Sequence, residues 1–173
     1  MVTHSLFFPT RRKEFNSTAQ NFLFFDMGSR STIASIASYQ LVQTKENGYA
    51  ETNPQVTIKA VGVDRTLGGM EFTIRLRDHL AKAFNDMKLA KKDVTSNAKA
   101  MNKLLKEAER VKLILSANKE AFAQIEGLME EKDFKFKVTR EEFLGLVGDL
   151  LLRVTKPIEE AIKSSQMTWA EIR

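Results

Sequence analysis

Cysteine is absent from the 173-residue chain, and only two histidines occur, His4 and His79. Without cysteine the chain can form no disulfide, no thiol nucleophile and no cysteine zinc site. The two histidines are far apart in sequence and have no companion motif, which argues against a histidine-centred triad or metal site. We therefore expect neither a catalytic residue nor a protein-ligated metal, and we expect both histidines to be structural or exposed to solvent.

Long apolar runs are missing as well. No segment approaches the roughly 18 apolar residues that a membrane helix needs. The first residues, MVTHSLFFPTRRK, lack a long apolar stretch behind a basic start. We therefore expect a soluble chain with no membrane contact and no targeting segment of its own. With 43% hydrophobic residues the chain can still bury a real core.

The positive charge is modest and scattered. Lysine and arginine number 27 against 22 acidic residues, and the excess lies in clusters at 11–13, 91–92 and 132–137. A nucleic-acid-binding face usually concentrates such charge and places aromatic residues between the bases that it stacks. No such pattern occurs here, so we expect no nucleic-acid partner, and a basic nucleic-acid-binding protein is the least favoured function.

Residues 21–67 have the pattern of a small antiparallel sheet. Apolar residues at 22–25 and β-branched segments at 31–44 and 55–63 indicate strands, and polar residues 45–54 indicate a turn region. The alternating apolar residues predicted to share one face of the last strand are Val56, Ile58 and Ala60.

Beyond Gly68-Gly69 the apolar period changes from two to 3.6, which predicts a first helix of about five turns ending near Met87. A second helix contains Met101 to Leu115, with Ser96 or Asn97 as its cap and Asn118 at its end. Its apolar stripe consists of Met101, Leu104, Leu105, Ala108, Val111 and Leu115.

The last part of the chain predicts a hairpin and two more helices. Two strands joined by an acidic turn are expected within 121–139. Thr139 and Glu142 have the spacing of a capping box, which predicts a helix through TREEFLGLVGDLLLR. Pro157 starts a last helix that runs to about Gln166. The whole layout is α plus β in two small subdomains.

Three short motifs could hold a phosphorylated ligand. In FLFFDMGSRST, a strand ends at Asp26 and a turn with Gly28 follows, which could present backbone N–H groups to phosphate and a carboxylate to hydrated magnesium. An ordinary hairpin turn is an equally good interpretation. In DRTLGGMEF, glycines stand at a helix start, where an anion is favoured, although a tight connection explains them too.

The third motif lies on the second helix. Glu109, Lys112, Leu113 and Ser116 share one stripe that could grip the sugar and base of a nucleotide. A surface ion pair at this spacing is the alternative interpretation. The three motifs occur in the order that one nucleotide site would need, and together they favour the site more than any of them does alone.

These segments resemble a known family. The stretches FFDMGSRST, VDRTLGGMEF, EAERVKLILSAN, IEGLMEEKDFKFKVTREEF and GDLLLRV are similar, in order and spacing, to the second lobe of the nucleotide-binding domain of the seventy-kilodalton heat-shock chaperones. The similarity covers about residues 11–173 and is strongest to the large endoplasmic-reticulum members of that family.

The resemblance implies an actin-like ATPase fold of the α/β (α+β) class, of which this chain supplies lobe II. It implies a leading segment at 1–20, a partial subdomain IIA at 21–67, subdomain IIB at 68–148 and a helical return toward IIA at 149–173. ATP or ADP with magnesium would lie between the two lobes. The implied nucleotide-binding residues are Asp26, Gly28, Ser29 and Ser31 in the phosphate loop, Gly69 near the phosphates, and Glu109, Lys112 and Ser116 on the ribose and adenine side.

The chain departs from the family at four positions. Ser29 and Arg30 stand where typical members have glycines, and Ile33 replaces a second aspartate. Both changes weaken the expectation of efficient hydrolysis, because glycine lets the backbone approach phosphate and a carboxylate orders the waters of magnesium. Leu113 stands where many members place an arginine against adenine.

The resemblance also implies a cellular role. The parent chaperone would help secretory proteins to fold in the endoplasmic-reticulum lumen, with unfolded clients and the main lumenal heat-shock chaperone as partners, on which it would promote nucleotide exchange. The family's first lobe and its peptide-binding domain would lie outside this segment, so we expect no ATP hydrolysis by this chain alone. The alternative is a chaperone-interaction module that needs no nucleotide. A lumenal location would make the sequon Asn16-Ser17-Thr18 a glycosylation site.

Overall fold

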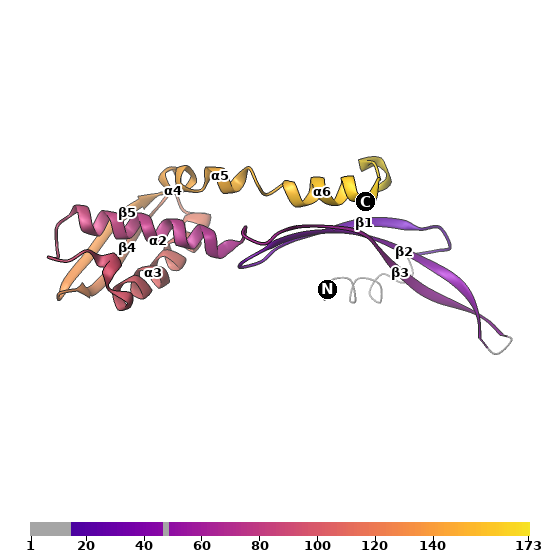
Figure 1. The fold of residues 1–173 in the computed structure, drawn as a ribbon, viewed down its shortest axis with the longest axis horizontal. Helices are drawn as coiled ribbons and strands as arrows, with labels where there is room; N and C mark the ends of the chain where they lie inside the picture. The colour runs from indigo at the N-terminus through magenta and orange to yellow at the C-terminus, as the bar shows by residue number, and fades with distance from the viewer. Residues whose placement is uncertain (1–14, 47–48) are drawn as a thin grey trace. The chain divides into compact units, whose positions relative to one another are not determined.

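The computed structural model describes residues 15–46 and 49–173, which form two compact units (Figure 1). Unit 1 consists of the described residues up to Leu67 together with Arg153–Arg173, and unit 2 is Gly68–Leu152. Each unit combines helices with strands, and 42% of the residues are helical and 36% lie in strands. The predicted mixed α/β class is confirmed.

Unit 1 is built on a three-stranded antiparallel sheet in the order β1-β2-β3. The strands are β1 (Gln20–Met27), β2 (Thr32–Glu46) and β3 (Tyr49–Asp64), so the predicted meander is confirmed. The expectation that residues 45–54 form only a turn region is wrong, because β2 and β3 run far into it. Backbone pairing does not require apolar side chains, and Gln40 bonds Gln55 across the strands at 2.5 Å.

A bulge changes which residues of β3 share a face. Ile36 pairs with Ala60, but the next residue of β2, Ala37, pairs with Ile58. The extra residue in β3 turns the alternation over, so Ala60 and Ile58 lie on opposite faces of the sheet. The predicted common face of Val56, Ile58 and Ala60 is therefore wrong: Ala60 is buried, whereas Ile58 is 49% exposed.

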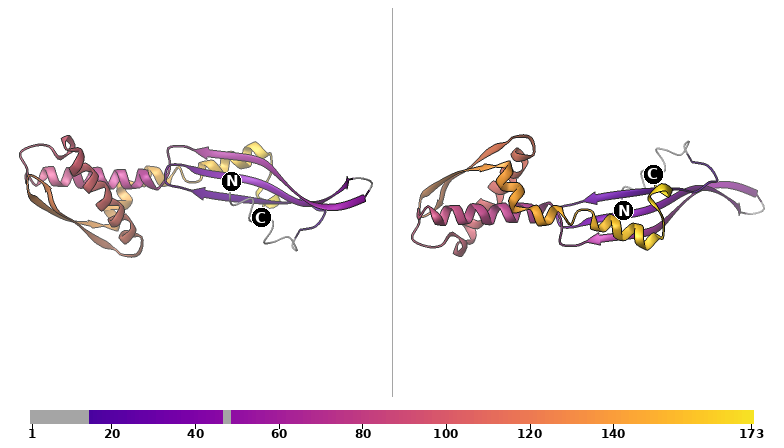
Figure 2. Two further views of the ribbon diagram at one scale, coloured as in Figure 1. Left: turned by 90° about the horizontal axis from the view of Figure 1, so that it is seen from below. Right: turned by 90° about the horizontal axis from the view of Figure 1, so that it is seen from above.

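Helix α6 (Lys156–Ser165) covers the Ile36 face of the sheet, as Figure 2 shows. It packs Ile158, Ala161 and Ile162 against Ala34 and Ile36. The predicted helix start at Pro157 and end at Gln166 are both confirmed, with Gln166 in the left-handed conformation that ends a helix. The short helix η3 (Trp169–Glu171) follows, and Ile172 then forms a parallel bridge with Asn21 of β1.

Unit 2 packs helices α2 (Gly69–Asp86) and α3 (Ala98–Ala117) on one face of a β-hairpin. The hairpin consists of β4 (Glu120–Met129) and β5 (Lys132–Thr139). The shorter elements are η2 (Val94–Ser96), α4 (Arg140–Leu146) and α5 (Gly148–Leu151). The core of the unit includes Leu76, Leu80, Phe84, Leu104, Val111 and Phe134.

Several helix ends in unit 2 match the sequence signals. The Asn97 side chain accepts hydrogen bonds from the N–H groups of Lys99 and Ala100, and α3 ends at Asn118. The capping box of Thr139 and Glu142 is present. The single helix predicted after it is wrong, because Val147 leaves the helical conformation and separates α4 from α5. Glycines on both sides of Val147 lower the cost of this break.

Helix α6 packs so closely against β3 at Gly62 that a side chain at this position would collide with the helix backbone. A Cβ atom at position 62 would lie 2.0 Å from the carbonyl oxygen of Pro157, so the helix would have to move away from the sheet. We expect Gly62→Ala to destabilise unit 1 by about 1–3 kcal/mol. Urea unfolding followed by the fluorescence of Trp169, the only tryptophan and part of unit 1, measures the change.

The matched control is Gly145→Ala in α4, where an added Cβ meets no atom within 4 Å. This change should be neutral or stabilise unit 2 by up to about 1 kcal/mol, because alanine is the better helix former. Circular dichroism during urea unfolding measures it. Equal effects of the two substitutions would contradict the close approach of α6 to β3.

Candidate functional site

The candidate phosphate loop is the turn between β1 and β2. Gly28 donates its N–H to the carbonyl oxygen of Ser31 at 2.9 Å, so the turn consists of residues 28–31. This is one residue later than the turn at Met27 to Arg30 that the hairpin pattern of the sequence predicts. Ser29 and Arg30 lie exposed at its tip, and Asp26 is exposed at the end of β1. The predicted loop residues are thus brought together in one turn of unit 1.

The turn offers a magnesium ion few ligands. The cross-strand partner of Asp26 is Ile33, an apolar residue with a 37% exposed side chain. Across residues 15–46 and 49–173, no group of three or more histidine, aspartate or glutamate side chains could hold a metal ion. A single carboxylate leaves most of the coordination positions of magnesium to water, which makes this turn a poor metal site by itself.

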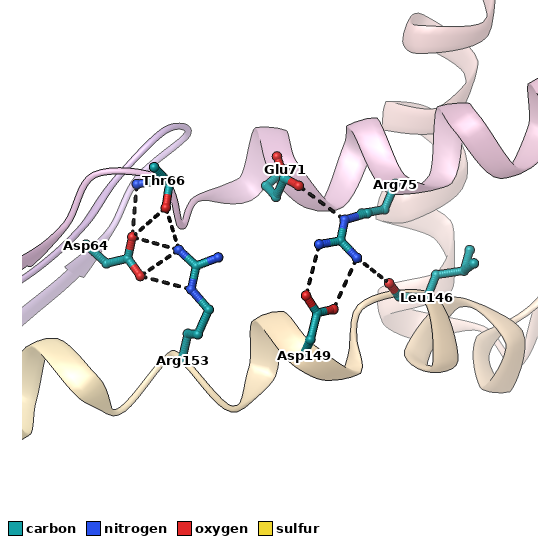
Figure 3. Close-up of polar contacts among 7 residues, drawn as sticks. All are labelled: Asp64, Thr66, Glu71, Arg75, Leu146, Asp149 and Arg153. Carbon is teal, nitrogen blue, oxygen red and sulfur yellow. Dashed lines mark hydrogen bonds and ion pairs between the residues drawn. The ribbon is translucent and has the colours of Figure 1, made fainter.

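The DRTLGG segment is anchored to unit 1 at the end of β3 (Figure 3). Asp64 accepts from the Thr66 N–H at 2.9 Å and forms a two-pronged ion pair with Arg153, whose shortest N–O distance is 2.8 Å. The buried Thr32 hydroxyl donates to the carbonyl oxygen of Leu67 at 2.9 Å. These bonds fix the backbone just before the two glycines.

The pKa of Asp64 lies below its ordinary value. The bond from the Thr66 N–H is the largest cause, partial burial opposes it, and Arg153 lowers the pKa further. Asp64 therefore stabilises the fold in its charged form.

In unit 2 a second arginine holds the start of α2 to α5 (Figure 3). Arg75 pairs with both oxygens of Asp149, at 3.1 and 2.9 Å, and with Glu71 one turn earlier in α2 at 3.1 Å. The same guanidinium donates to the carbonyl oxygen of Leu146 at 3.4 Å. The start of the unit is thus tied to its end, close to Leu152.

The candidate sugar-binding residues form one polar network in unit 2. Lys112 donates to the Gly69 carbonyl oxygen at 3.1 Å, to Thr73 Oγ1 at 2.8 Å and to Glu109 Oε2 at 2.9 Å. The Thr73 hydroxyl donates to the same Glu109 oxygen at 2.5 Å. The pKa of Glu109 is lowered, first by the Thr73 hydroxyl and then by Lys112.

Ser116 and Leu113 lie beside this network without joining it. The Ser116 hydroxyl donates to the carbonyl oxygen of Leu113 at 2.6 Å, one turn back in α3. Its oxygen stays exposed and can still accept a bond from a ligand. Leu113 is 63% exposed and offers an apolar surface on the same helix.

The predicted site residues thus fall into two sets. Asp26, Gly28, Ser29 and Ser31 lie in unit 1, whereas Gly69, Glu109, Lys112 and Ser116 lie in unit 2. Sequence reasoning missed Thr73, which is 1% exposed and bonds both Glu109 and Lys112. The only available signal was a lone hydroxyl among the apolar residues of α2.

The remaining sequence predictions concern single residues. His79 is partly buried in α2, with its ring centroid 5.7 Å from that of Phe136, and its Nε2 has no hydrogen-bond partner within the described residues. The structural role predicted for it fits, whereas His4 lies outside the described residues. Asn16 is exposed, and its Oδ1 accepts from the Thr18 N–H at 2.8 Å. No helix in the described part of the chain is long and apolar enough to cross a membrane.

The lowered pKa of Asp64 predicts a pH-dependent contribution to stability. We expect Asp64→Asn to destabilise unit 1 by about 1–3 kcal/mol near pH 7, because Arg153 and Thr66 lose a charged acceptor. A depressed folded pKa contributes stability above the unfolded pKa that is lost as the pH falls through the folded value. The difference between the wild type and the variant should therefore be full above about pH 5 and shrink as the solution is acidified below about pH 4.

Urea unfolding at several pH values, followed by Trp169 fluorescence, measures this difference. Asp26→Asn is the matched control, because Asp26 belongs to the same unit and its side chain is exposed. The control should leave stability within about 0.5 kcal/mol at every pH. A pH-independent loss in Asp64→Asn would show that the charge of Asp64 contributes nothing to the fold.

Comparisons with known proteins identify the family of the chain. A family model described as "Hsp70 protein" matches residues 12–173. The chain is 58% identical to "Hypoxia up-regulated protein 1" of Xenopus laevis, 59% identical to that of Danio rerio and 52% identical to that of Homo sapiens. Each match covers 94% of this chain.

The chain covers a much smaller share of the relatives' own length. The chain spans 25% of the length of the Xenopus laevis protein and 16% of the Danio rerio and Homo sapiens proteins. The resemblance predicted from the sequence motifs is confirmed, and the mixed α/β structure agrees with a lobe of an actin-like domain. The chain belongs to the Hsp70 family.

Proposed function

We propose that the chain forms the second lobe of the ATP-binding domain of a molecular chaperone in the endoplasmic-reticulum lumen. The observation that carries this proposal is the network of Gly69, Thr73, Glu109 and Lys112, which gathers three predicted nucleotide-binding residues in one place. Identities of 52–59% to proteins named for their induction in hypoxia support it. A role in folding secretory proteins under stress suits such relatives.

In this proposal each of the two sets of residues has its own task. Asp26, Gly28, Ser29 and Ser31 form the phosphate loop, and Gly69 lies near the phosphates. Glu109, Lys112 and Ser116 receive the ribose and adenine side, where carboxylate, ammonium and hydroxyl groups can bond sugar hydroxyls. Asp26 would hold magnesium through its water shell, and the ion would neutralise phosphate charge. Arg30 and Ile33 make this chain a binder of nucleotide more than a hydrolase.

The partners in this proposal are a lumenal heat-shock chaperone and unfolded client proteins. The parent protein would promote nucleotide exchange on the partner chaperone. We assign the partner contact to unit 2, which has its own core and ties its start to its end through Arg75 and Asp149.

The alternative is an interaction module that binds the partner chaperone without nucleotide. One observation favours it: Lys112 already has three bonds within the chain, so it is satisfied without any ligand. Nucleotide binding by the chain distinguishes the two functions.

We expect the isolated chain to bind ATP and magnesium weakly and not to hydrolyse ATP. In the full domain phosphate contacts come from both lobes, and each charged hydrogen bond that is absent costs about 1.5–3 kcal/mol. Affinity falls about tenfold for each 1.4 kcal/mol, so the dissociation constant should be millimolar or weaker. Calorimetry measures it, and a low micromolar constant would contradict the requirement for a second lobe.

The same preparation should still bind the lumenal heat-shock chaperone in a pull-down. Arg75→Met loosens unit 2 and should weaken this binding. Arg77→Met is the control. Among the described residues Arg77 pairs only with the adjacent Asp78, so its loss should leave unit 2 intact. Partner binding together with weak, millimolar ATP binding supports the proposed function, whereas partner binding with no ATP binding at tens of millimolar ATP supports the alternative. Failure of both assays would contradict both functions.

Asn16 should carry a glycan if the chain enters the secretory pathway. Its exposed side chain precedes β1, and the sequon residues Ser17 and Thr18 are exposed as well. Expression behind a cleavable signal peptide, with mass spectrometry of wild type, Asn16→Gln and Thr18→Ala, measures the occupancy. Both variants should lose the same glycan mass, because each destroys the sequon. Three unglycosylated products would refute the site.

A further inference from the structure

The hydrogen bonds of Lys112 are fully used inside unit 2. An ammonium group has three N–H donors and no acceptor. Lys112 directs them to the Gly69 carbonyl, Thr73 Oγ1 and Glu109 Oε2, at 3.1, 2.8 and 2.9 Å. Its side chain is only 19% exposed. A sugar hydroxyl could bond to Lys112 only by displacing one of these partners.

Thr73 joins the other members of the network. Its hydroxyl accepts from Lys112 and has one proton to give. Two oxygens lie within reach, Glu109 Oε2 at 2.5 Å and the Gly69 carbonyl at 3.1 Å. The shorter distance and the negative charge of the carboxylate favour Glu109. Because Thr73 is 1% exposed, water cannot replace its hydroxyl.

Glu109 is left with one oxygen that is free for a ligand. Oε2 receives both Thr73 and Lys112, whereas Oε1 has no partner within the described residues. The Glu109 side chain is 47% exposed, so this oxygen can be reached from solvent. A carboxylate that is held at one oxygen presents the other in a fixed direction.

We propose that Thr73 is a positioning residue for sugar recognition: with Lys112 it holds Glu109 Oε2, so that Oε1 accepts the ligand's sugar hydroxyl. This inference rests on the proposed nucleotide site and assigns its residues different tasks. Glu109 contacts the sugar through Oε1, and Thr73 acts through Glu109. The recognised group is a hydroxyl donor, so the network selects a nucleoside over its free base.

Two variants at position 73 test the role. Thr73→Val removes the hydroxyl at nearly constant volume, and Thr73→Ser keeps it. Both are measured in the whole 173-residue chain by NMR, with urea unfolding as the check that each variant folds. The first readout is the pKa of Glu109, followed at its side-chain carboxyl carbon. It should rise toward the ordinary value in Thr73→Val and stay low in Thr73→Ser.

The second readout is ligand affinity from amide shifts, with adenosine and adenine as probes. Adenosine should bind Thr73→Val about threefold to tenfold more weakly than the wild type, as expected for the loss of one hydrogen bond. Thr73→Ser should stay within about twofold of the wild type. Adenine lacks the sugar and should show the same affinity for all three proteins.

The outcomes separate this inference from the proposed function. An unchanged Glu109 pKa in Thr73→Val shows that Thr73 does not position Glu109, which overturns the inference whatever the adenosine affinity is. A raised pKa with unchanged adenosine affinity shows that the held carboxylate does not read the sugar, which also overturns the inference. If adenosine causes no shifts in the wild type at any concentration up to its solubility limit, the chain holds no nucleoside site of its own, and sugar recognition by Thr73 is refuted with it.

Discussion

The ion pair between Arg153 and Asp64 is the contact on which unit 1 depends, because it joins residues 89 positions apart. The chain leaves the sheet after Leu67 and returns at Arg153, so α6 can cover the sheet only if the returning segment is fixed in place. Closing so long a loop has an entropic cost that grows slowly with its length. The two-pronged ion pair fixes both the distance and the direction between Arg153 and Asp64. The close approach of Pro157 to Gly62 then keeps α6 aligned with the sheet.

Unit 2 follows the same principle with its own arginine. Arg75 ties the first turns of α2 to Asp149 in α5, while the apolar residues of α2, α3 and the hairpin form a separate core. Because this core needs no residue of unit 1, the network around Glu109 is set within unit 2 alone. The proposed sugar side therefore requires only that α2 and α3 pack correctly: Gly69 and Thr73 come from one helix, Glu109 and Lys112 from the other.

The sequence predicted those features that depend on near neighbours. The Asn97 cap, the capping box of Thr139 and the start of α6 at Pro157 each rest on contacts within a few residues, and all three are present. The bulge in β3 depends on the packing of the sheet, and the break at Val147 depends on the packing of α5. The apolar periodicity of a single segment contains no information about either contact. For the same reason Thr73 was missed, since its role arises only where α2 meets α3, 36 positions further along the chain.

The two sets of predicted binding residues differ in how completely their hydrogen bonds are satisfied within the chain. On the sugar side, every donor of Lys112 and one oxygen of Glu109 are satisfied within the chain, which fixes their geometry before any ligand arrives. On the phosphate side, Asp26 faces Ile33 in the register of the hairpin, and Arg30 lies at the tip of the turn. Fixed donors favour binding, whereas hydrolysis needs ordered magnesium waters and close backbone approach to the phosphate. In the proposed function the chain is therefore better built to recognise a nucleoside than to act on its phosphates.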